Sequence, residues 1–380
     1  MKPGHVALLG PANSIHLQRW AIALAARGWR VSVITQHAAE ALPLPASVQG
    51  HALPASVQLH ALPVRGAAGY FLNAPALSRL LRKLKPDVLN VHYASGYGTT
   101  AALVGYTPTL LSVWGSDVYD FPYESAFKGW WLRRNLRRAT ALASTSRAMA
   151  RQVQRLTPER QHIAITPFGV DMARFAPQAD APPRAGFTLG IVKTLAPKYG
   201  IDLLLRAFEG LRADADVMAA QPALRLLIVG DGPQRSELVM LARVLGITAH
   251  CEFAGAVPHA DVPQWLHRLD VYAAPSRLDS ESFGVAIVEA GACGLPVVVS
   301  DAGGLPEVVV DGVTGLVVPR DNVAALQAAL KRLVLDAGLR ERMGRAARAH
   351  VMREYEWGTC VDRMVACYDA LRAPVPQTNE

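Results

Sequence analysis

Hydrophobic positions in the first half of the chain fall into short apolar runs separated by stretches with helical periodicity. The stretches with helical periodicity predict helices at residues 14–27 and near residues 71–84, with further helical segments between the later strands. Strands are predicted at residues 5–10, 30–35, 87–92, 109–113, 141–144 and 162–166. Short apolar runs that alternate with helices are typical of βαβ units and a parallel sheet.

The second half of the chain repeats this pattern after a proline-rich stretch, residues 175–183, which we interpret as a linker. Strands are predicted at residues 187–192, 224–229, 251–253, 271–274 and 296–300, and helices at 201–211, 234–245, 283–293 and 322–335. The sequence therefore predicts an α/β protein with two tandem Rossmann-like, doubly wound domains, residues 1–184 and 185–356, that face each other across a cleft. The C-terminal segment, residues 357–380, contains a helix that we expect to pack back on the first domain.

Composition narrows the class of protein. A chain of 380 residues with 51% hydrophobic and 18% charged residues is long enough for two cores and is not disordered. No apolar run reaches the length of a membrane span, and no signal peptide precedes the first strand, so a cytoplasmic location is expected. The four cysteines have no metal-binding spacing and indicate free thiols in a reducing compartment. A nine-residue repeat, Leu44–Ala52 and Leu53–Ala61, is interpreted as a duplication in a surface loop.

The formal net charge of +8 permits two interpretations. It is either a solubilising surface or an attraction to anionic partners, namely nucleotide sugars or lipid headgroups, whereas nucleic acid is disfavoured because no recognition motif is present. Residues 128–138 place Trp130 and Trp131 beside four arginines, which suits a basic amphipathic helix on an anionic membrane surface. The alternative is an ordinary helix with Trp131 and Leu132 in the core.

Two glutamates in the second half mark the most informative segment. Seven residues separate Glu281 from Glu289, and Glu289 lies in the otherwise apolar run 284–294, which predicts a buried helix. A buried carboxylate needs a partner, and no basic residue lies within that run. We therefore expect a ligand rich in hydroxyl groups to bind Glu289.

Other candidate residues follow predicted strands of the second half. Lys193 and Lys198 follow the first strand and suit a diphosphate, although solvated surface lysines are the alternative. Gly230 and Gly232 form a tight turn after a buried strand, where a glycine backbone can approach a ligand closely. This turn is a weak signal by itself, because many α/β folds contain one.

The first half has weaker signals. The turn after the first strand lacks a dinucleotide-binding fingerprint. Asn13 or Ser14 either caps the following helix or, together with His16, contacts an acceptor.

Taken together, these motifs resemble the retaining GT-B glycosyltransferases of family four, also called group 1 glycosyltransferases. The resemblance rests on the two glutamates with their spacing of seven residues, the Gly230-Asp-Gly-Pro233 turn, the paired lysines and Gly303-Gly-Leu-Pro-Glu307. The segments Asn13–Trp20, Trp114–Asp117 and Phe168–Asp171 are also similar to that family. The resemblance covers nearly the whole chain and is more specific in the second half.

The resemblance implies that the second domain binds a nucleotide diphosphate sugar as a substrate, with no cofactor and no metal ion. It implies that Glu289 holds the ribose and that Glu281 contacts the donor sugar or positions its loop. The segment Ser282, Phe283 and Gly284 would bind the diphosphate at a helix N-terminus, and Lys193 and Lys198 would stabilise the departing phosphates.

Two positions depart from the family pattern. Lys193 stands where the family commonly has arginine, which keeps the charge but not the planar fork. Trp114 stands where the family often has histidine, so we expect this protein to recognise the acceptor or the donor sugar through different contacts. Asp117 remains, either to accept a hydrogen bond from a substrate hydroxyl or to cap the next segment.

The function expected from this resemblance is retaining, metal-independent sugar transfer to a glycan or lipid-linked saccharide in cell-surface polysaccharide biosynthesis. The enzyme would be cytoplasmic and peripheral on the inner face of the membrane. Two alternatives stay open: a nucleotide-sugar epimerase of GT-B fold, and a non-catalytic subunit that binds nucleotide sugars.

Overall fold

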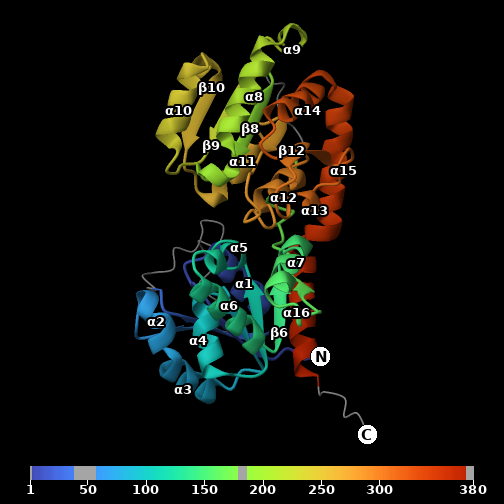
Figure 1. Cartoon of the computed structure of the whole chain (residues 1–380). Helices are drawn as coiled ribbons and strands as arrows, with labels where there is room; N and C mark the ends of the chain where they lie inside the picture. The colour runs from blue at the N-terminus through green and yellow to red at the C-terminus, as the bar shows by residue number, and fades with distance from the viewer. Residues whose placement is uncertain (1, 38–56, 179–185, 374–380) are drawn as a thin grey trace. The chain divides into compact units, whose positions relative to one another are not determined.

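The computed structural model describes residues 2–37, 57–178 and 186–373, which form two compact units. The first unit comprises residues 1–167 and 358–380, and the second comprises residues 168–357 (Figure 1). The division falls earlier than the expected boundary at residue 184. Val170 explains the difference, because its backbone pairs with Glu356 of the second unit.

The first unit is built on a seven-stranded parallel sheet with the order β3-β2-β1-β4-β5-β6-β7. Residues of β1, β4 and β5 are buried throughout, as expected for strands covered on both faces. The strands are β1 His5–Leu9, β2 Arg30–Thr35, β3 Val57–Ala61, β4 Val88–His92, β5 Thr109–Val113, β6 Ala141–Ser144 and β7 Ala164–Ile165. The helices are α1 Ile15–Ala26, α2 Gly66–Leu72, α3 Ala74–Leu84, α4 Gly96–Val104, α5 Ser116–Tyr119, η1 Phe121–Tyr123, α6 Ala126–Arg138 and α7 Arg147–Leu156.

The C-terminal helix α16, Trp357–Arg372, contributes to the first unit. The hydroxyl of Tyr368 accepts a hydrogen bond of 2.7 Å from the side-chain amide of Asn90 in β4, and its ring contacts Trp29. Arg372 donates to the carbonyl of Lys2. These contacts bury one face of α16 against the sheet of this unit.

The second unit has a six-stranded parallel sheet with the order β10-β9-β8-β11-β12-β13. Its strands are β8 Thr188–Val192, β9 Arg225–Val229, β10 Cys251–Gly255, β11 Val271–Ala274, β12 Val297–Ser300 and β13 Gly315–Val318. Its helices are η2 Pro197–Tyr199, α8 Ile201–Ala213, α9 Ala215–Ala220, α10 Arg235–Val244, η3 Thr248–His250, η4 His259–Asp261, α11 Val262–Leu266, α12 Val285–Ala292, α13 Leu305–Val308, α14 Val323–Leu335 and α15 Ala337–Tyr355. The two parallel, doubly wound sheets confirm the expected fold class.

The structure corrects three details of the sequence interpretation. Residues 57–61, the end of the repeat interpreted as a surface loop, form the edge strand β3, which pairs with β2. The rest of the repeat, residues 44–56, lies outside the described residues. Strand β13 and helix α15 were missing from the predicted elements, because Gly315–Val318 is very short and arginines interrupt the apolar positions of α15.

In the described part of the chain, none of the helices is both long and apolar enough to cross a membrane.

Candidate active site

Each sheet has a point where the strand order reverses, and several predicted site residues follow the strands at these points. In the first unit β1 lies between β2 and β4, and in the second unit β8 lies between β9 and β11. Loops at the carboxyl ends of such strands diverge and leave a crevice that open α/β folds use for ligands. Lys193 directly follows β8 and is therefore placed at the crevice of the second unit.

Lys193 forms an ion pair with Glu281 in this crevice. The ammonium nitrogen lies 2.7 Å from Oε1 of Glu281, and the two side chains are only 20% and 9% exposed. Burial by itself would lower the pKa of Lys193, but the charge and hydrogen bond of Glu281 outweigh it and the pKa is raised. Lys193 is therefore a fixed cation in this unit.

Tyr199 brings the second predicted lysine to the same place. Its ring lies 4.6 Å from the ammonium of Lys193 and 4.9 Å from that of Lys198. The attraction of a cation to the face of an aromatic ring stabilises each ammonium group beside Tyr199. The structure thus brings Lys193, Lys198 and Glu281 into one cluster around Tyr199, a residue that sequence reasoning missed.

The glycines after β9 bring one loop against another. A Cβ atom on Gly230 would lie 1.9 Å from the carbonyl oxygen of Lys193, and one on Gly232 would lie 2.5 Å from that of Leu195. The backbone of Leu195 also pairs with Asp231. Gly230 and Gly232 were expected to let backbone approach a ligand, but the close approach seen here is to the loop that carries Lys193.

Gly303 and Gly304 have the same role for the loop that carries Glu281. A Cβ atom on Gly304 would lie 2.0 Å from the carbonyl oxygen of Ser282, and one on Gly303 would lie 2.5 Å from that of Glu281. The amide of Gly304 donates to the carbonyl of Glu281 at 3.1 Å. This double-glycine turn therefore allows the two loops to pack backbone against backbone and fixes the position of the Glu281 loop.

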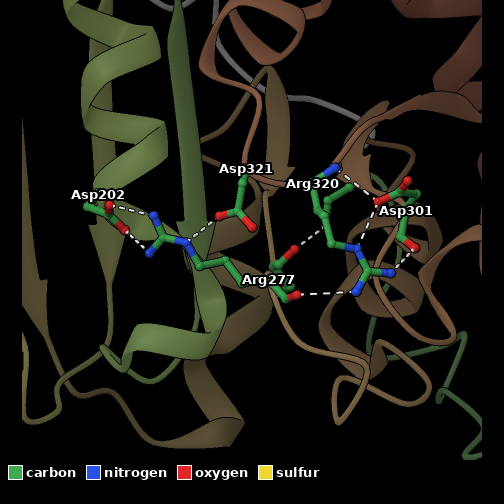
Figure 2. Close-up of polar contacts among 7 residues, drawn as sticks. Asp202, Arg277, Asp301, Arg320 and Asp321 are labelled. Carbon is green, nitrogen blue, oxygen red and sulfur yellow. Dashed lines mark hydrogen bonds and ion pairs between the residues drawn. The ribbon is translucent and has the colours of Figure 1, made fainter.

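Two arginines, Arg277 and Arg320, pair with several aspartates near the start of the Glu281 loop (Figure 2). Arg277 makes a bidentate pair with Asp202 of α8, at 2.7 and 2.8 Å, and its Nε lies 2.7 Å from Asp321. Its backbone amide donates to the carbonyl of Lys198 at 2.7 Å. The loops that carry Lys198 and Glu281 are thereby joined through one residue.

Arg320 completes the brace from the end of β13. Its guanidinium lies 2.9 Å from Asp279 and 3.1 Å from Asp301, and it donates to the carbonyl oxygen of Arg277 at 3.3 Å (Figure 2). Asp279 in turn accepts from the amide of Gly303. Planar guanidinium groups suit such multiple pairing, which a lysine could not reproduce.

Glu289 has a protein partner that sequence reasoning missed. It lies on α12 and is 5% exposed, and its Oε1 lies 2.7 Å from Nε2 of His259. Arg174 donates to the carbonyl oxygen of His259, so a guanidinium group also lies nearby. His259 approaches from η4, beyond the end of β10, so the carboxylate has a protein partner in addition to the ligand that the sequence predicts for it. The position of His259 after a strand at the same sheet edge was the available signal.

The predicted diphosphate segment lies at the start of α12. Gly284 is the N-cap residue with φ of +90°, a backbone conformation that glycine adopts without strain. Ser282 and Phe283 are buried, and the ring of Phe283 packs edge-on against Phe168 and Tyr355. The side chain of Phe283 therefore anchors the loop, which leaves backbone amides as the groups of this residue suited to an anion.

In the first unit, three aromatic rings surround Trp114, and one of them belongs to the predicted acceptor residue His16. The Trp114 ring lies 5.8 Å from the ring of His16, 5.1 Å from His92 and 5.6 Å from Tyr93. His92 is fully buried, which lowers its pKa to about 3 and keeps it neutral. His92 is the last residue of β4 and Tyr93 directly follows it. Neither residue was selected from the sequence.

Asp117 braces loops of the first unit. It is 1% exposed, and its carboxylate accepts hydrogen bonds from the amides of Ala94, Trp114 and Gly115 at 2.8, 3.1 and 2.8 Å. Burial raises its pKa, and these hydrogen bonds partly offset the effect. These amides belong to the loops that follow β4 and β5 and all precede Asp117, so they are not the next segment that one interpretation expected Asp117 to cap.

The turn after β1 leaves its polar side chains at the surface. Ser14 occupies the N-cap position of α1 but makes no side-chain capping hydrogen bond. Asn13 is exposed. The simple capping role is therefore not observed for Ser14, and both residues lie on the loop at the crevice of the first unit.

Comparisons with known proteins assign both halves to one family. The model of glycosyl transferases group 1 matches residues 175–350, and the model of glycosyl transferase 4-like domains matches residues 5–146. One relative, the GDP-mannose-dependent alpha-(1-6)-phosphatidylinositol monomannoside mannosyltransferase of Mycolicibacterium smegmatis, is 36% identical over 51% of this chain. The D-inositol 3-phosphate glycosyltransferase of Salinispora arenicola is 31% identical over 63% of this chain. The matches span about half the length of these relatives, 52% and 56%.

Solved structures share the fold across the whole chain. Sucrose-phosphate synthase from Thermosynechococcus elongatus superposes with a TM-score of 0.80 at 20% identity, covering 97% of this chain and 99% of that one. HepE of Anabaena, solved in complex with UDP, gives a TM-score of 0.77 at 18% identity, covering 97% and 100%. With both family models and this GT-B architecture in agreement, the chain belongs to the group 1 (family four) glycosyltransferases.

Proposed function

We propose that this protein transfers a sugar from a nucleotide diphosphate sugar to an acceptor hydroxyl. The cluster of Lys193, Lys198 and Tyr199 at the strand-order reversal of the second unit carries the proposal. Two ammonium groups held at a crevice supply positive charge where a diphosphate leaving group develops negative charge. Since this charge is supplied by side chains, the proposed reaction needs no metal ion.

The proposed step exchanges one bond for another at the anomeric carbon. The acceptor oxygen forms a bond to the anomeric carbon while the bond between this carbon and the diphosphate oxygen breaks. The proton of the acceptor hydroxyl passes to the departing phosphate. We propose retention of configuration through attack on the same face as departure. Glu281 is not assigned as a nucleophile of the kind that retaining glycosidases use, because Lys193 already pairs with it. Its proposed role is to orient Lys193 and contact donor hydroxyls.

The proposed donor clamp comprises the amides of Phe283 and Gly284 for the diphosphate and Glu289 for the ribose. His259 supports this role, since its hydrogen bond fixes one oxygen of Glu289. A buried, oriented carboxylate is a good acceptor for vicinal hydroxyl groups. Guanosine and uridine both stay candidates for the base.

The proposed acceptor is a lipid-linked saccharide or phosphoinositide at the cytoplasmic face of the membrane, in the synthesis of cell-surface glycans. Two relatives support this class: the name of one specifies GDP-mannose and phosphatidylinositol monomannoside, and the name of the other specifies D-inositol 3-phosphate. We propose that the saccharide of this acceptor contacts the predicted acceptor residues, namely Asn13, Ser14, His16 and Trp114.

Helix α6 is proposed to rest on the anionic membrane surface. Both interpretations of this segment find support: Leu132 is fully buried, whereas Phe127 and Trp130 are 62% and 53% exposed. Flotation with anionic liposomes tests the proposal. The variant Trp130→Ala should float less than the wild type, whereas Met240→Ala, which removes an equally exposed side chain from α10, should float equally.

Nucleotide binding and sugar transfer test the main proposal separately. A thermal-shift screen over nucleoside diphosphates and their sugars should identify a stabilising donor, because a ligand bound only by the folded state raises the melting temperature. With that donor in labelled form, transfer to an added acceptor indicates a transferase, epimerised donor indicates an epimerase, and binding without turnover indicates a silent subunit. The Glu289→Ala variant should lose nucleotide affinity; unchanged affinity would remove Glu289 from the clamp.

A further inference from the structure

A large apolar cavity in the first unit has no role in the chemistry described so far. Its volume is about 700 Å³, within the range of small-molecule sites. Aromatic rings from several elements line it, among them Tyr70 and Phe71 of α2, Tyr97 of α4, Phe121 of η1, and Phe127 and Trp131 of α6. Such a lining favours an apolar ligand, and the elements involved are neighbours, because α4 contacts both α2 and α6, and α6 contacts η1.

The cavity has an opening with an apolar rim. Phe71 and Phe127 both line it and are 47% and 62% exposed, so they lie at its mouth. Leu72 and Trp130, next to them in α2 and α6, are 62% and 53% exposed. Large apolar side chains that gather around an opening mark a binding site more often than an ordinary surface.

The other end of the cavity reaches the predicted acceptor crevice. Its lining includes Pro11, which follows β1, and Tyr93, which follows β4. The ring of Tyr93 lies 5.6 Å from that of Trp114, which also contacts the predicted acceptor residue His16. A molecule lying in the cavity therefore extends from the exposed apolar rim to the crevice of the first unit.

The charges near the mouth fit an amphipathic ligand with an anionic group. Lys128 lines the cavity and pairs with Glu124, whereas Arg133 and Arg134 add two positive charges further along α6, with the Arg134 guanidinium 4.9 Å from the centre of the Trp131 ring. The apolar interior has no carboxylate among its described lining residues. Hydrocarbon inside and phosphate at a cationic mouth is the arrangement that these charges favour.

We infer that this cavity binds one hydrocarbon chain of the acceptor lipid and so presents the attached saccharide to the crevice. The inference rests on the proposed glycosyl transfer, which it extends by assigning a lipid subsite. A finite cavity gives it a signature that a membrane surface lacks: affinity rises with each methylene until the space is filled and then stops rising. Each buried methylene is expected to tighten binding about three- to fourfold before that plateau.

Calorimetric titration with alkyl glucosides of increasing chain length, each below its micelle concentration, tests the inference on the full chain. We expect saturable binding at one site, with the stepwise rise and plateau. Two variants should each weaken binding of the tightest-binding alkyl glucoside at least tenfold. Phe127→Asp places a charge at the mouth of the cavity, and Ala67→Trp fills part of the cavity from α2. Leu103→Asp is the matched control, because Leu103 is 41% exposed on α4 and does not line the cavity.

The possible outcomes separate this inference from the proposed function. Affinity independent of chain length, affinity that rises without a plateau, or an equal loss in Leu103→Asp would overturn the hydrocarbon subsite. Nucleoside diphosphate binding is measured on the same preparations, and we expect it to be unchanged in all three variants. Binding of the alkyl chain without any nucleotide binding would support the subsite and refute the donor proposal. Nucleotide binding without binding of the alkyl chain would refute the subsite and support the donor proposal.

Discussion

The ion pair between Lys193 and Glu281 gives the sharpest test of whether Lys193 serves folding, ligand binding or both. The perturbation is a cycle of three variants: Lys193→Met, Glu281→Leu and the double variant. Each single change leaves one charge without its partner, whereas the double change replaces both charges by apolar groups. Structural and ligand-binding roles then predict different results for the double variant.

The magnitudes follow from the distance and the burial. At 2.7 Å and an effective dielectric constant of about 20, the attraction is about 6 kcal/mol before desolvation. Desolvation costs several kcal/mol for each ion, so the net contribution of the pair is small. Lys193→Met strands a carboxylate that is 9% exposed and should cost about 3 kcal/mol. Glu281→Leu should cost less, since Lys193 is 20% exposed and its flexible chain can reach water.

Scanning calorimetry of the four proteins measures the stability, and titration with nucleoside diphosphates measures the binding. The double variant should recover most of the stability that Lys193→Met loses, yet bind the diphosphate roughly 10- to 100-fold more weakly, because a charged hydrogen bond contributes about 1.5–3 kcal/mol. A double variant as unstable as the sum of the single variants would refute the pairing argument. One that binds nucleotide like the wild type would refute the role of Lys193 in charge neutralisation.

The pH dependence of the same cycle has a defined sign. The pKa of Lys193 is raised above its ordinary 10.5, so the folded state holds this proton more tightly than the unfolded state. The stabilisation is therefore fully present below pH 10.5 and is lost as the pH rises through the raised pKa. The stability difference between the wild type and Lys193→Met should stay constant from pH 7 to pH 9.

Three further predictions concern the loops around the two crevices. Gly304→Ala should destabilise the second unit by roughly 3 kcal/mol in calorimetry, because the new methyl group would lie 2.0 Å from the carbonyl oxygen of Ser282. The control Gly312→Ala should cost only about 1 kcal/mol, because its methyl group has no atom within 4 Å and only the positive φ is unfavourable. Equal losses of stability in the two variants would contradict this explanation. Arg320→Ala should weaken nucleotide binding several-fold in calorimetric titration through a loosened Glu281 loop, and a variant with wild-type affinity would show that the brace does not matter. Asp117 has a raised pKa, so its contribution to stability is present at acidic pH and falls as the pH rises through that pKa; Asp117→Asn should remove this slope from the urea-unfolding free energy, and an unchanged slope would exclude Asp117 as its source.

The sequence by itself determined the two parallel sheets and most of the residues at their carboxyl ends. Apolar runs such as Leu226–Val229 define buried strands, and the topology of βαβ units brings the residue after each strand to the same edge. Lys193 and the Gly230 turn were placed correctly for this reason. Strand β3 was missed because Val57–Ala61 lies inside a repeat that reads as loop.

Only the tertiary structure decided which groups meet. His259 pairs with Glu289, and Tyr199 gathers two lysines, through contacts between loops that follow different strands. A partner thirty residues away leaves no periodic pattern, so the sequence indicated that Glu289 needs a partner but not which one. The apolar cavity is also a product of packing, because α2, α4 and α6 contribute its walls from separate segments. Local chemistry thus fixed the sheets and their edges, and long-range packing fixed the pairs and the pocket.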